Sequence, residues 1–270
     1  MSDKLGQLRA ILHDMESVIV AYSGGIDSTF VLKIASEELA ERAIAVTAVS
    51  PSLAHAELEE AQGIAAMIGV QHVCLPTNEV EDPRYQANTP QRCYFCKGNL
   101  YDVLVPYARE HGYRNIVDGN NADDAGDHRP GRQAAREHGV RSPLEEAGLT
   151  KAEIRNLARA AGLPNWNKPA AACLSSRIPY GNRVTVQLLS QVEQAEAYLR
   201  ARGFRQLRVR HHGPVARLEV EENELGRALE LRTEIVDALQ QIGFTYVALV
   251  LAGYRMGSLN ETLRNGRGAA

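Results

Sequence analysis

The chain has 270 residues, of which 44% are hydrophobic and 23% charged, and its formal net charge is −3. This balance is typical of a globular protein with one large domain or two modest ones. A slightly acidic surface has no overall attraction for nucleic acid or an anionic membrane, so any phosphate binding has to be local. No apolar stretch approaches the roughly 20 residues that span a bilayer, and the N-terminus lacks a signal core. We therefore expect a cytoplasmic protein with neither a membrane nor a nucleic acid as partner.

The first half of the chain alternates short apolar runs with helical patterns. The predicted strands cover 17–22, 43–49, 71–75 and 114–118, and the predicted helices cover 27–40, 55–68 and 96–110. Apolar, β-branched runs such as SVIVAY are typical of strands buried on both faces. Strands separated by helices predict an α/β fold with a doubly wound parallel sheet.

Further along, 151–161 has a helical pattern, with Thr150 as N-cap and Glu153 in the capping-box position. The connector 163–182 contains prolines but no periodicity, and we interpret it as an ordered loop and a domain junction. The pattern then predicts helix 184–202, strands 206–211 and 215–220, helix 222–241 and strand 245–252. This order indicates a smaller C-terminal α+β domain, so we divide the chain into domains 1–168 and 169–270.

The most informative motif is Ser23-Gly24-Gly25-Ile26-Asp27-Ser28, between a predicted strand and a predicted helix. Glycines let the backbone turn tightly, so that successive N–H groups form an anion-binding nest at a helix N-terminus. Ser23 and Ser28 can add hydroxyl donors. The spacing fits neither the Walker motif nor the dinucleotide fingerprint. Without a ligand, the same residues would be a Gly-Gly turn that caps a helix.

This motif resembles the PP-loop of the ATP pyrophosphatases, which split ATP between its α and β phosphates and transfer AMP. The resemblance implies that the loop holds the leaving pyrophosphate and that adenine lies near the ends of the second and fourth strands. The residues assigned to ATP on this basis are Ala21, Ser23, Gly24, Gly25, Asp27, Ser28, Val49 and Gly119.

An acidic turn follows the strand 114–118, with DGNNADD at 118–124 and then Asp127 and Arg129. In a doubly wound fold this turn lies at the carboxyl edge of the sheet, where ligands bind. Asp123, Asp124 and Asp127 are candidate Mg²⁺ ligands, since Mg²⁺ prefers carboxylates combined with phosphate oxygens. Arg129 is a counter-charge for phosphate, so Asp123, Asp124 and Arg129 complete the residues assigned to ATP. The alternative is a solvated turn, which Asp, Asn and Gly favour without any ligand.

Three cysteines form the next candidate site: Cys93 and Cys96 in a CxxC at a predicted helix start, and Cys173 in the connector. A helix N-terminus and neighbouring Arg or Lys stabilise thiolates. The three thiols are compatible with zinc completed by a histidine, with a redox pair, or with an iron–sulfur cluster whose fourth iron stays open. The fourth cysteine, Cys74, is predicted to be a buried small hydrophobe in a strand.

Several segments together resemble the LarE family of ATP-dependent sulfur transferases, and the resemblance covers nearly the whole chain. They are SGGIDS, NTPQRCYFCKGNLY, DGNNADD with HRPG, RSPL, KPAAACLSSRIPYG and RVRHHGPVARLEV. The resemblance implies adenylation of the carboxylates of a small nucleotide, pyridinium-3,5-biscarboxylic acid mononucleotide, and their conversion to thiocarboxylates. The product is the ligand for nickel in the pincer cofactor of lactate racemase. A homo-oligomer is also implied, with a hexamer as the candidate state.

Within the LarE family the cysteines distinguish two sulfur sources. Members with only the cysteine matching Cys173 give up its own sulfur, whereas three-cysteine members resemble [4Fe-4S] insertases that carry sulfide from a separate donor. Because Cys93 and Cys96 accompany Cys173, we expect the cluster type, with these three cysteines as catalytic ligands. Sacrifice of Cys173 is the alternative. Asn120 stands where the family pattern often has Thr, which leaves the metal contacts of the acidic turn open.

Arg208 and Arg210 alternate onto one face of a predicted hairpin, and with Arg177 they are candidate receptors for the substrate phosphate. The alternative for this face is solvation, with glutamates as partners.

Two other enzyme classes share such a loop, the tRNA thiolases and the ammonia-delivering amidotransferases. The acidic net charge and the lack of an extended basic, aromatic-bearing segment disfavour RNA, and ammonia delivery leaves the cysteines unexplained. A non-catalytic nickel or cluster chaperone is the rival from another class. Pyrophosphate release from ATP distinguishes the enzymes from that chaperone.

Overall fold

The computed structural model describes residues 2–124, 130–169 and 172–255. The candidate residues Asp127 and Arg129 lie outside the described residues. The chain divides into two compact units, one of Met1–Asp82 with Gln91–Ala171 and the other of Pro83–Pro90 with Ala172–Ala270.

The first unit contains the predicted doubly wound parallel sheet. Its strands are β1 (Val18–Ala21), β2 (Ala43–Val49), β3 (His72–Pro76) and β4 (Asn115–Val117), in the order β3-β2-β1-β4. All three pairings are parallel. The chain moves outward from β1 through β2 to β3 and then returns to the other side of β1. The strand order therefore reverses between β1 and β4, which is where open α/β sheets bind ligands.

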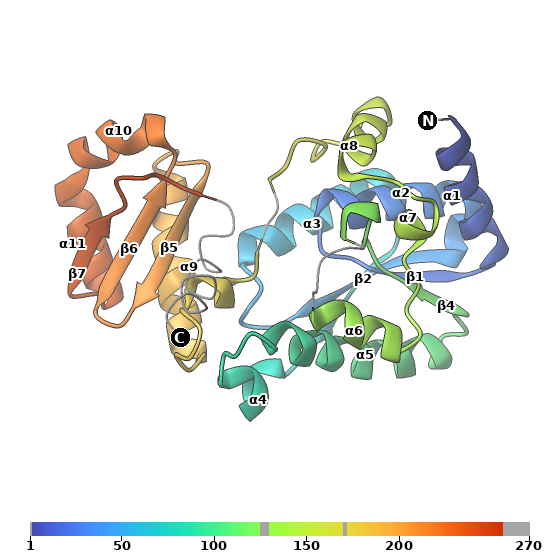
Figure 1. Cartoon of the computed structure of the whole chain (residues 1–270), viewed down its shortest axis with the longest axis horizontal. Helices are drawn as coiled ribbons and strands as arrows, with labels where there is room; N and C mark the ends of the chain where they lie inside the picture. Colours follow the sequence, from blue (N-terminus) through green and yellow to red (C-terminus); the bar gives the residue numbers. More distant parts are fainter. Residues whose placement is uncertain (1, 125–129, 170–171, 256–270) are drawn as a thin grey trace, which may run out of the picture. The chain divides into compact units, whose positions relative to one another are not determined.

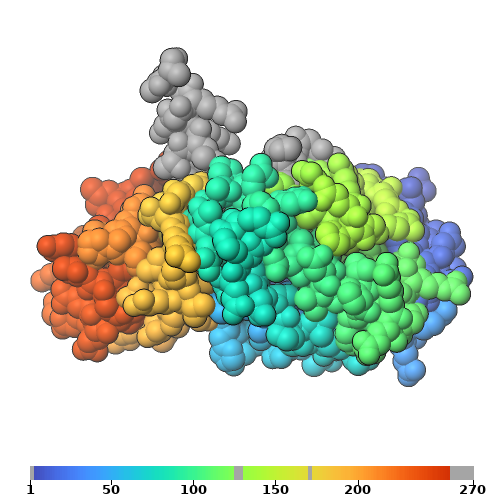
Figure 2. Space-filling model, turned by 90° about the horizontal axis from the view of Figure 1, so that it is seen from below, coloured from blue at the N-terminus to red at the C-terminus, as the bar shows by residue number. Residues whose placement is uncertain are grey.

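Helices cover both faces of this sheet, so the unit has three layers (Figure 1). Side chains alternate along β1, so that Val18 and Val20 enter one core and Ile19 and Ala21 the other. The first core lies under α1 (Ser2–Asp14), α2 (Ile26–Leu39), α3 (His55–Ile68), α7 (Pro143–Glu146) and α8 (Lys151–Ala160). The second lies under α5 (Arg92–Glu110) and α6 (Pro130–Glu137), which lie side by side in Figures 1 and 2. Short 3-10 turns complete the unit: η1 (Ala40–Arg42), η2 (Glu79–Glu81) and η3 (Ala122–Asp124).

The periodicity did not predict α1, α6 or α7. In α1 charged residues stand among the apolar ones, and α6 (PGRQAARE) is short and has only a proline and two alanines as apolar side chains, so neither shows an extended apolar periodicity in the sequence. None of the helices that the structure describes combines the length and the apolar composition required to cross a bilayer.

The second unit is the predicted α+β module. Its sheet has the order β5-β6-β7, with β5 (Leu207–His212) antiparallel to β6 (Val215–Val220) and β7 (Tyr246–Leu249) parallel to it. The helix α9 (Val186–Ala201) packs on this sheet. The predicted helix 222–241 is wrong as a single element, because the chain forms η5 (Glu222–Glu224), α10 (Leu225–Glu230) and α11 (Arg232–Ile242). Ala228 of α10 and Ile235 and Leu239 of α11 contribute to the same core.

The segment 83–90, which includes α4 (Pro83–Gln86), packs within the second unit although it lies far away in sequence. The buried side chain of Asn88 donates hydrogen bonds to the carbonyls of Ile178, Pro179 and Asn182, at 3.2, 2.8 and 3.0 Å. Tyr85 bonds to Ser175 in η4 (Leu174–Arg177). The segment thus supports the backbone that follows Cys173.

Candidate active site

The phosphate loop lies between β1 and α2, at the point where the strand order reverses. The chain leaves β1 at Ala21, turns at Gly24 with φ +68°, and enters α2 after Gly25. Gly25 is the N-cap and gives no side-chain hydrogen bond to the first turn of the helix. The N–H groups of that turn therefore face a position where an anion can bind.

Two serine hydroxyls hold the loop in shape. Ser23 Oγ and Ser28 Oγ are 3.1 Å apart, and Ser28 Oγ donates to the Gly25 carbonyl at 3.1 Å. The backbone N–H of Ser23 donates to Ser28 Oγ at 3.3 Å. The loop is therefore preformed, and its hydroxyls lie next to the N-terminus of α2.

Two glycines allow other elements to approach the loop closely. A Cβ on Gly24 would lie 2.8 Å from the Cβ of Ala61 on α3. A Cβ on Gly119, just after β4, would lie 2.6 Å from the nitrogen of Ser28. The structure thus brings Gly24, Ser28 and Gly119 together, as the sequence predicts for a nucleotide site at this edge of the sheet.

Asp27, in the first turn of α2, faces the start of α8. It accepts a hydrogen bond from Lys151 Nζ, whereas its Oδ1 is buried and has no partner in the described part of the chain. Burial raises the pKa of Asp27, Lys151 opposes this shift, and the nearby charge of Asp124 adds to it. The backbone N–H of Lys151 also donates to Asp123 Oδ2 at 2.9 Å. The start of α8 therefore links two carboxylates, those of Asp27 and Asp123, and the charge of Asp124 lies close enough to act on Asp27.

These carboxylates have the chemistry of Mg²⁺ ligands, but they could supply only some of the ligands that the ion needs. The unpartnered Oδ1 of Asp27 is a hard oxygen of the kind that Mg²⁺ prefers, and Asp123 and Asp124 lie close by on η3. Among the residues with a described position, no three His, Cys, Asp or Glu side chains form a group that could hold a metal ion. A magnesium ion here would therefore depend on phosphate oxygens for its remaining ligands.

Asp118 directly follows β4, on the other side of the loop. It is buried, and its Oδ1 accepts hydrogen bonds from Ser142 Oγ at 2.7 Å and from the Asn120 N–H at 3.0 Å. Burial raises the pKa of Asp118, against the effect of these two donors. The amide of Asn120 donates to Oδ2 at 2.5 Å. Asn120, which departs from the family pattern, thus orients Asp118 in this structure.

A buried carboxylate that the sequence analysis missed lies against the turn after β2, where adenine is predicted beside Val49, although it belongs to η2, which follows β3. Glu79 is only 3% exposed and accepts hydrogen bonds from the hydroxyls of Ser50, Ser52 and Thr77. Glu79 had no signal in the sequence, because it stands among other acidic residues that look like a solvated turn.

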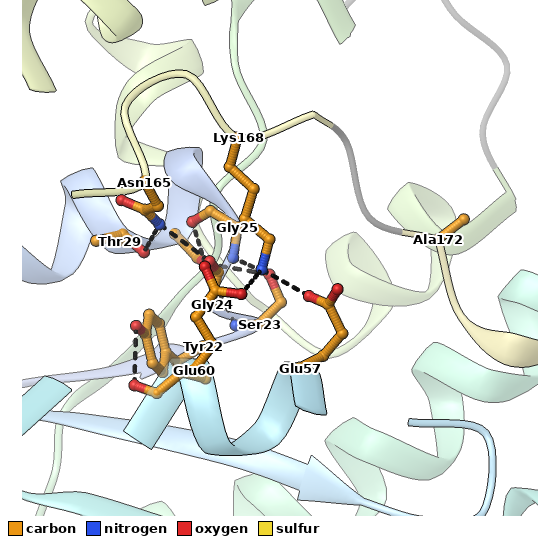
Figure 3. A network of polar contacts seen from close by, with 12 residues as sticks. Tyr22, Ser23, Gly24, Gly25, Thr29, Glu57, Glu60, Asn165, Lys168 and Ala172 are labelled. Carbon is orange, nitrogen blue, oxygen red and sulfur yellow. Dashed lines mark hydrogen bonds and ion pairs between the residues drawn. The ribbon is translucent and has the colours of Figure 1, made fainter. Parts of the chain in front are cut away.

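The connector before Cys173 also contacts the loop, which the sequence analysis did not predict (Figure 3). Asn165 is 3% exposed and donates to the Gly24 carbonyl and to Thr29 Oγ1, both at 3.0 Å. Lys168 forms ion pairs with Glu57 at 2.6 Å and Glu60 at 2.8 Å, both on α3. Asn165 and Lys168 of the connector are therefore part of the surroundings of the phosphate loop.

The three candidate cluster cysteines are divided between the units. Cys93 is exposed and Cys96 partly buried, one helical turn apart at the start of α5. They fit the paired soft ligands of a metal or cluster site. Cys173 is exposed and belongs to the second unit, directly before η4.

Cys74 is a correction, because it is exposed rather than buried. It lies in β3, the edge strand of the sheet. The amide Nε2 of Gln62, on α3, donates to the Cys74 sulfur at 3.7 Å.

Two of the three arginines assigned to substrate phosphate are buried and paired with carboxylates. Arg177 contacts both oxygens of Glu196, at 2.8 and 3.0 Å, and donates to the Cys173 carbonyl at 2.9 Å. Arg210 contacts both oxygens of Glu219, at 2.7 and 3.0 Å. In this structure these two arginines fix the backbone around Cys173 and the β5–β6 pair.

Arg208 differs from the other two. Its guanidinium donates to the Leu207 carbonyl at 2.7 Å and lies 5.3 Å from the centre of the Tyr254 ring. No carboxylate of the described residues forms an ion pair with it. Burial, followed by the charge of Arg177, lowers the pKa of Arg208. Of the three arginines, Arg208 has the charge most readily available to an anion.

Comparison with known proteins supports the fold and shows the family. A family model described as asparagine synthase matches residues 9–91, which include the phosphate loop. Pyridinium-3,5-bisthiocarboxylic acid mononucleotide synthase of Lactiplantibacillus plantarum is 39% identical over 264 residues, 97% of this chain and 96% of its own length. An uncharacterized protein of Synechocystis is 46% identical over 97% of this chain and 99% of its own length. An uncharacterized protein of Methanocaldococcus jannaschii is 28% identical over 89% of this chain and 91% of its own length.

Proposed function

The chain belongs to the LarE family, and on this premise we propose that it adenylates the carboxylates of pyridinium-3,5-biscarboxylic acid mononucleotide and converts them to thiocarboxylates. The observation that carries the proposal is the preformed loop 23–28 at the switch point of the sheet, with Ser28 against Gly119.

In the proposed reaction the loop binds the two phosphates that leave as pyrophosphate. The N–H groups at the start of α2 and the hydroxyls of Ser23 and Ser28 donate to their oxygens. Adenine lies between the ends of β2 and β4, near Val49 and Gly119. The carboxylates of Asp27, Asp123 and Asp124, with Asp127 as a further candidate, would supply the minority of the Mg²⁺ ligands that phosphate oxygens do not, and the bound ion would neutralise charge that develops on the phosphates.

Adenylation makes the substrate carboxyl reactive, because AMP is a much better leaving group than the carboxylate oxygen. The substrate carboxylate attacks the α-phosphorus, the bond between the α and β phosphates breaks, and pyrophosphate leaves. Sulfide then attacks the carbonyl carbon and AMP departs, so that a thiocarboxylate remains. Arg208 is the residue proposed to bind the phosphate of the substrate, with Arg177 and Arg210 holding the surrounding backbone.

For the sulfur source we retain the three-cysteine assignment. A [4Fe-4S] cluster bound by Cys93, Cys96 and Cys173 would leave one iron open to carry sulfide from a separate donor. We further propose that the protein is cytoplasmic and forms a homo-oligomer. In this proposal domain 1–168 binds ATP, and domain 169–270 carries out sulfur transfer.

The adenylation step is tested by incubating the protein with ATP, Mg²⁺ and the biscarboxylate nucleotide and measuring AMP, ADP and pyrophosphate. We expect AMP and pyrophosphate in equal amounts, and a loss of roughly tenfold or more in Ser28→Ala, since one donor to transferring charge is removed. Formation of ADP and phosphate, or no turnover of ATP, would contradict the proposal.

The sulfur source is tested separately by purifying the protein anaerobically and measuring iron, acid-labile sulfide and the visible spectrum. About four irons per chain, lost in Cys93→Ala, Cys96→Ala and Cys173→Ala, is the expected result. A colourless, iron-free protein after reconstitution would contradict the cluster. A mass loss of one H₂S at Cys173 after turnover would then identify Cys173 as the sulfur donor.

A further inference from the structure

The phosphate loop has no basic residue of its own. Its sequence, SGGIDS, contains one acid and no Lys or Arg. Two of the positive charges nearby belong to lysines that are already paired: Lys151 pairs with Asp27, and Lys168 pairs with Glu57 and Glu60. A triphosphate that binds to this loop therefore meets cations that are already engaged with carboxylates.

The position of Lys168 beside the loop is fixed by the connector. Asn165 is anchored on the Gly24 carbonyl, and the N–H of Lys168 donates to the Asn165 carbonyl at 3.0 Å. Pro169 follows, and a residue before proline is restricted to extended backbone. Figure 3 shows the Lys168 side chain pointing from the connector toward Glu57 and Glu60 in the neighbourhood of the loop.

The two partners of Lys168 belong to the wall of the same site. Glu60 precedes Ala61, the residue of α3 that packs against Gly24, and the Ala61 carbonyl accepts from Tyr22 Oη at 3.2 Å. The charge of Glu60 helps to raise the pKa of Tyr22, after the larger effect of burial. Lys168, Glu60 and the turn at Tyr22–Gly24 are thus close enough to influence one another.

The charges of this group do not balance. Two carboxylates share one ammonium, so the group has a net charge of −1 next to an anion-binding loop. Burial lowers the pKa of Lys168, but the hydrogen bonds and charges of Glu57 and Glu60 outweigh burial and raise it. The ammonium is therefore present at neutral pH, and an incoming phosphate competes with two carboxylates for it.

We propose that Lys168 is a phosphate-binding residue of the ATP site and that Glu57 and Glu60 hold its ammonium only while the site is empty. When ATP binds, Lys168 donates to the phosphates that leave as pyrophosphate, and after their departure it returns to Glu57 and Glu60. The competition of the carboxylates then assists product release. This inference rests on the proposed function, because it concerns the same ATP site.

The alternative is that Lys168 is only a structural tie between the connector and α3. Removing Lys168 alone does not separate the two cases, since it also leaves two unpaired carboxylates that repel phosphate. The comparison that separates them is Glu57→Gln/Glu60→Gln against the same double variant with Lys168→Ala added. In that background neutral amides replace both carboxylates. Any further loss of binding affinity on adding Lys168→Ala therefore reports the contact between Lys168 and phosphate.

The experiment measures binding of inorganic pyrophosphate and of ATP by isothermal titration calorimetry at constant ionic strength. The double glutamine variant is expected to bind pyrophosphate severalfold more tightly than the wild type, because Lys168 is released from its competitors. Adding Lys168→Ala should weaken binding roughly tenfold or more, and Lys168→Arg should restore most of it. Lys33→Ala, which removes a partly buried lysine paired with Glu37 on α2, is the matched control and should bind like the wild type.

Two outcomes would overturn the inference. One is a change of less than about twofold on adding Lys168→Ala to the double variant, and the other is weaker pyrophosphate binding by the double variant itself. Thermal unfolding of each variant identifies any that fail to fold, and Lys168→Arg then supplies the comparison. Failure of the wild type to bind either ligand would instead contradict the proposed function.

Discussion

Gly119 shows how a single residue decides whether the phosphate loop can form. It stands at the end of β4, where a Cβ would lie 2.6 Å from the nitrogen and 3.0 Å from the Cα of Ser28. Backbone atoms cannot yield at such distances, so only glycine lets the fourth strand approach the first turn of α2. The same reasoning applies to Gly24, which has positive φ and lies against Ala61.

Gly119→Ala is therefore expected to displace the backbone of Ser28 and so to distort the phosphate loop. Overpacking at this contact should cost about 1–3 kcal/mol of unfolding free energy and weaken ATP binding at least about tenfold, because Ser28 is displaced. Urea unfolding and ATP titration are the measurements. Gly63→Ala is the matched control, since a Cβ on Gly63 of α3 meets nothing within 4 Å and alanine favours a helix. Normal ATP binding by Gly119→Ala would contradict the close approach.

Among the elements, α8 has the most completely specified start. Thr150 Oγ1 accepts from the Glu153 N–H, and Glu153 accepts from the Thr150 N–H at 2.9 Å, which confirms the predicted capping box. Glu153 also pairs with Lys4 of α1 at 2.9 Å. The Thr150 N–H first, and then the Lys4 and Thr150 side chains, lower the pKa of Glu153 to about 2. Because α8 also carries Lys151 to Asp27, this cap contributes to positioning the phosphate site.

The depressed pKa of Glu153 predicts a pH dependence. A carboxyl group whose pKa is lower in the folded than in the unfolded state stabilises the fold above its ordinary pKa of 4.5, and this contribution disappears as pH falls toward 2. Glu153→Gln should therefore be less stable than the wild type at pH 7, and the difference should shrink progressively below pH 4.5. Thermal unfolding across this range is the measurement, with Thr150→Ser, which keeps the hydroxyl, as control. A difference that grows as the pH falls would contradict this assignment.

At the scale of the whole molecule, the second unit includes the segment 83–90, although the residues before and after this segment in the sequence belong to the first unit. Asn88 has φ +51° and donates to three carbonyls, one of which is 94 residues away in sequence. The N–H of Gly181 donates to the Asn88 carbonyl at 3.1 Å. The motif around Cys173 therefore depends on residues that no local pattern connects to it.

Asn88→Ala is expected to destabilise the second unit on the order of 3 kcal/mol, because three carbonyls lose the donor that the buried Asn88 amide supplies and alanine is strained at this φ. Asn88→Gly loses the same hydrogen bonds without the strain and should recover about 1 kcal/mol. Urea unfolding followed by circular dichroism compares the two variants with the wild type. Equal stability of Asn88→Ala and Asn88→Gly would contradict the strain, and wild-type stability of both would contradict the hydrogen bonds.

The sequence by itself determined the parallel sheet, the α+β module, the phosphate loop and the cap of α8. These features depend on residues that are neighbours in the chain: alternating apolar runs, Gly-Gly between a strand and a helix, and Thr150 three residues before Glu153. Only the tertiary structure decided which side chains complete the site. Asn165 lies 141 residues from Gly24, and Lys168 lies 111 residues from Glu57, so their pairing follows from packing that no periodicity records. The same packing exposed Cys74 at a sheet edge, divided the last long helix and paired Arg177 and Arg210 with glutamates. From the sequence alone, a polar residue in a turn is predicted to be solvent-exposed. Its role in binding a ligand or in holding two elements together is set only when elements distant in the sequence pack around it.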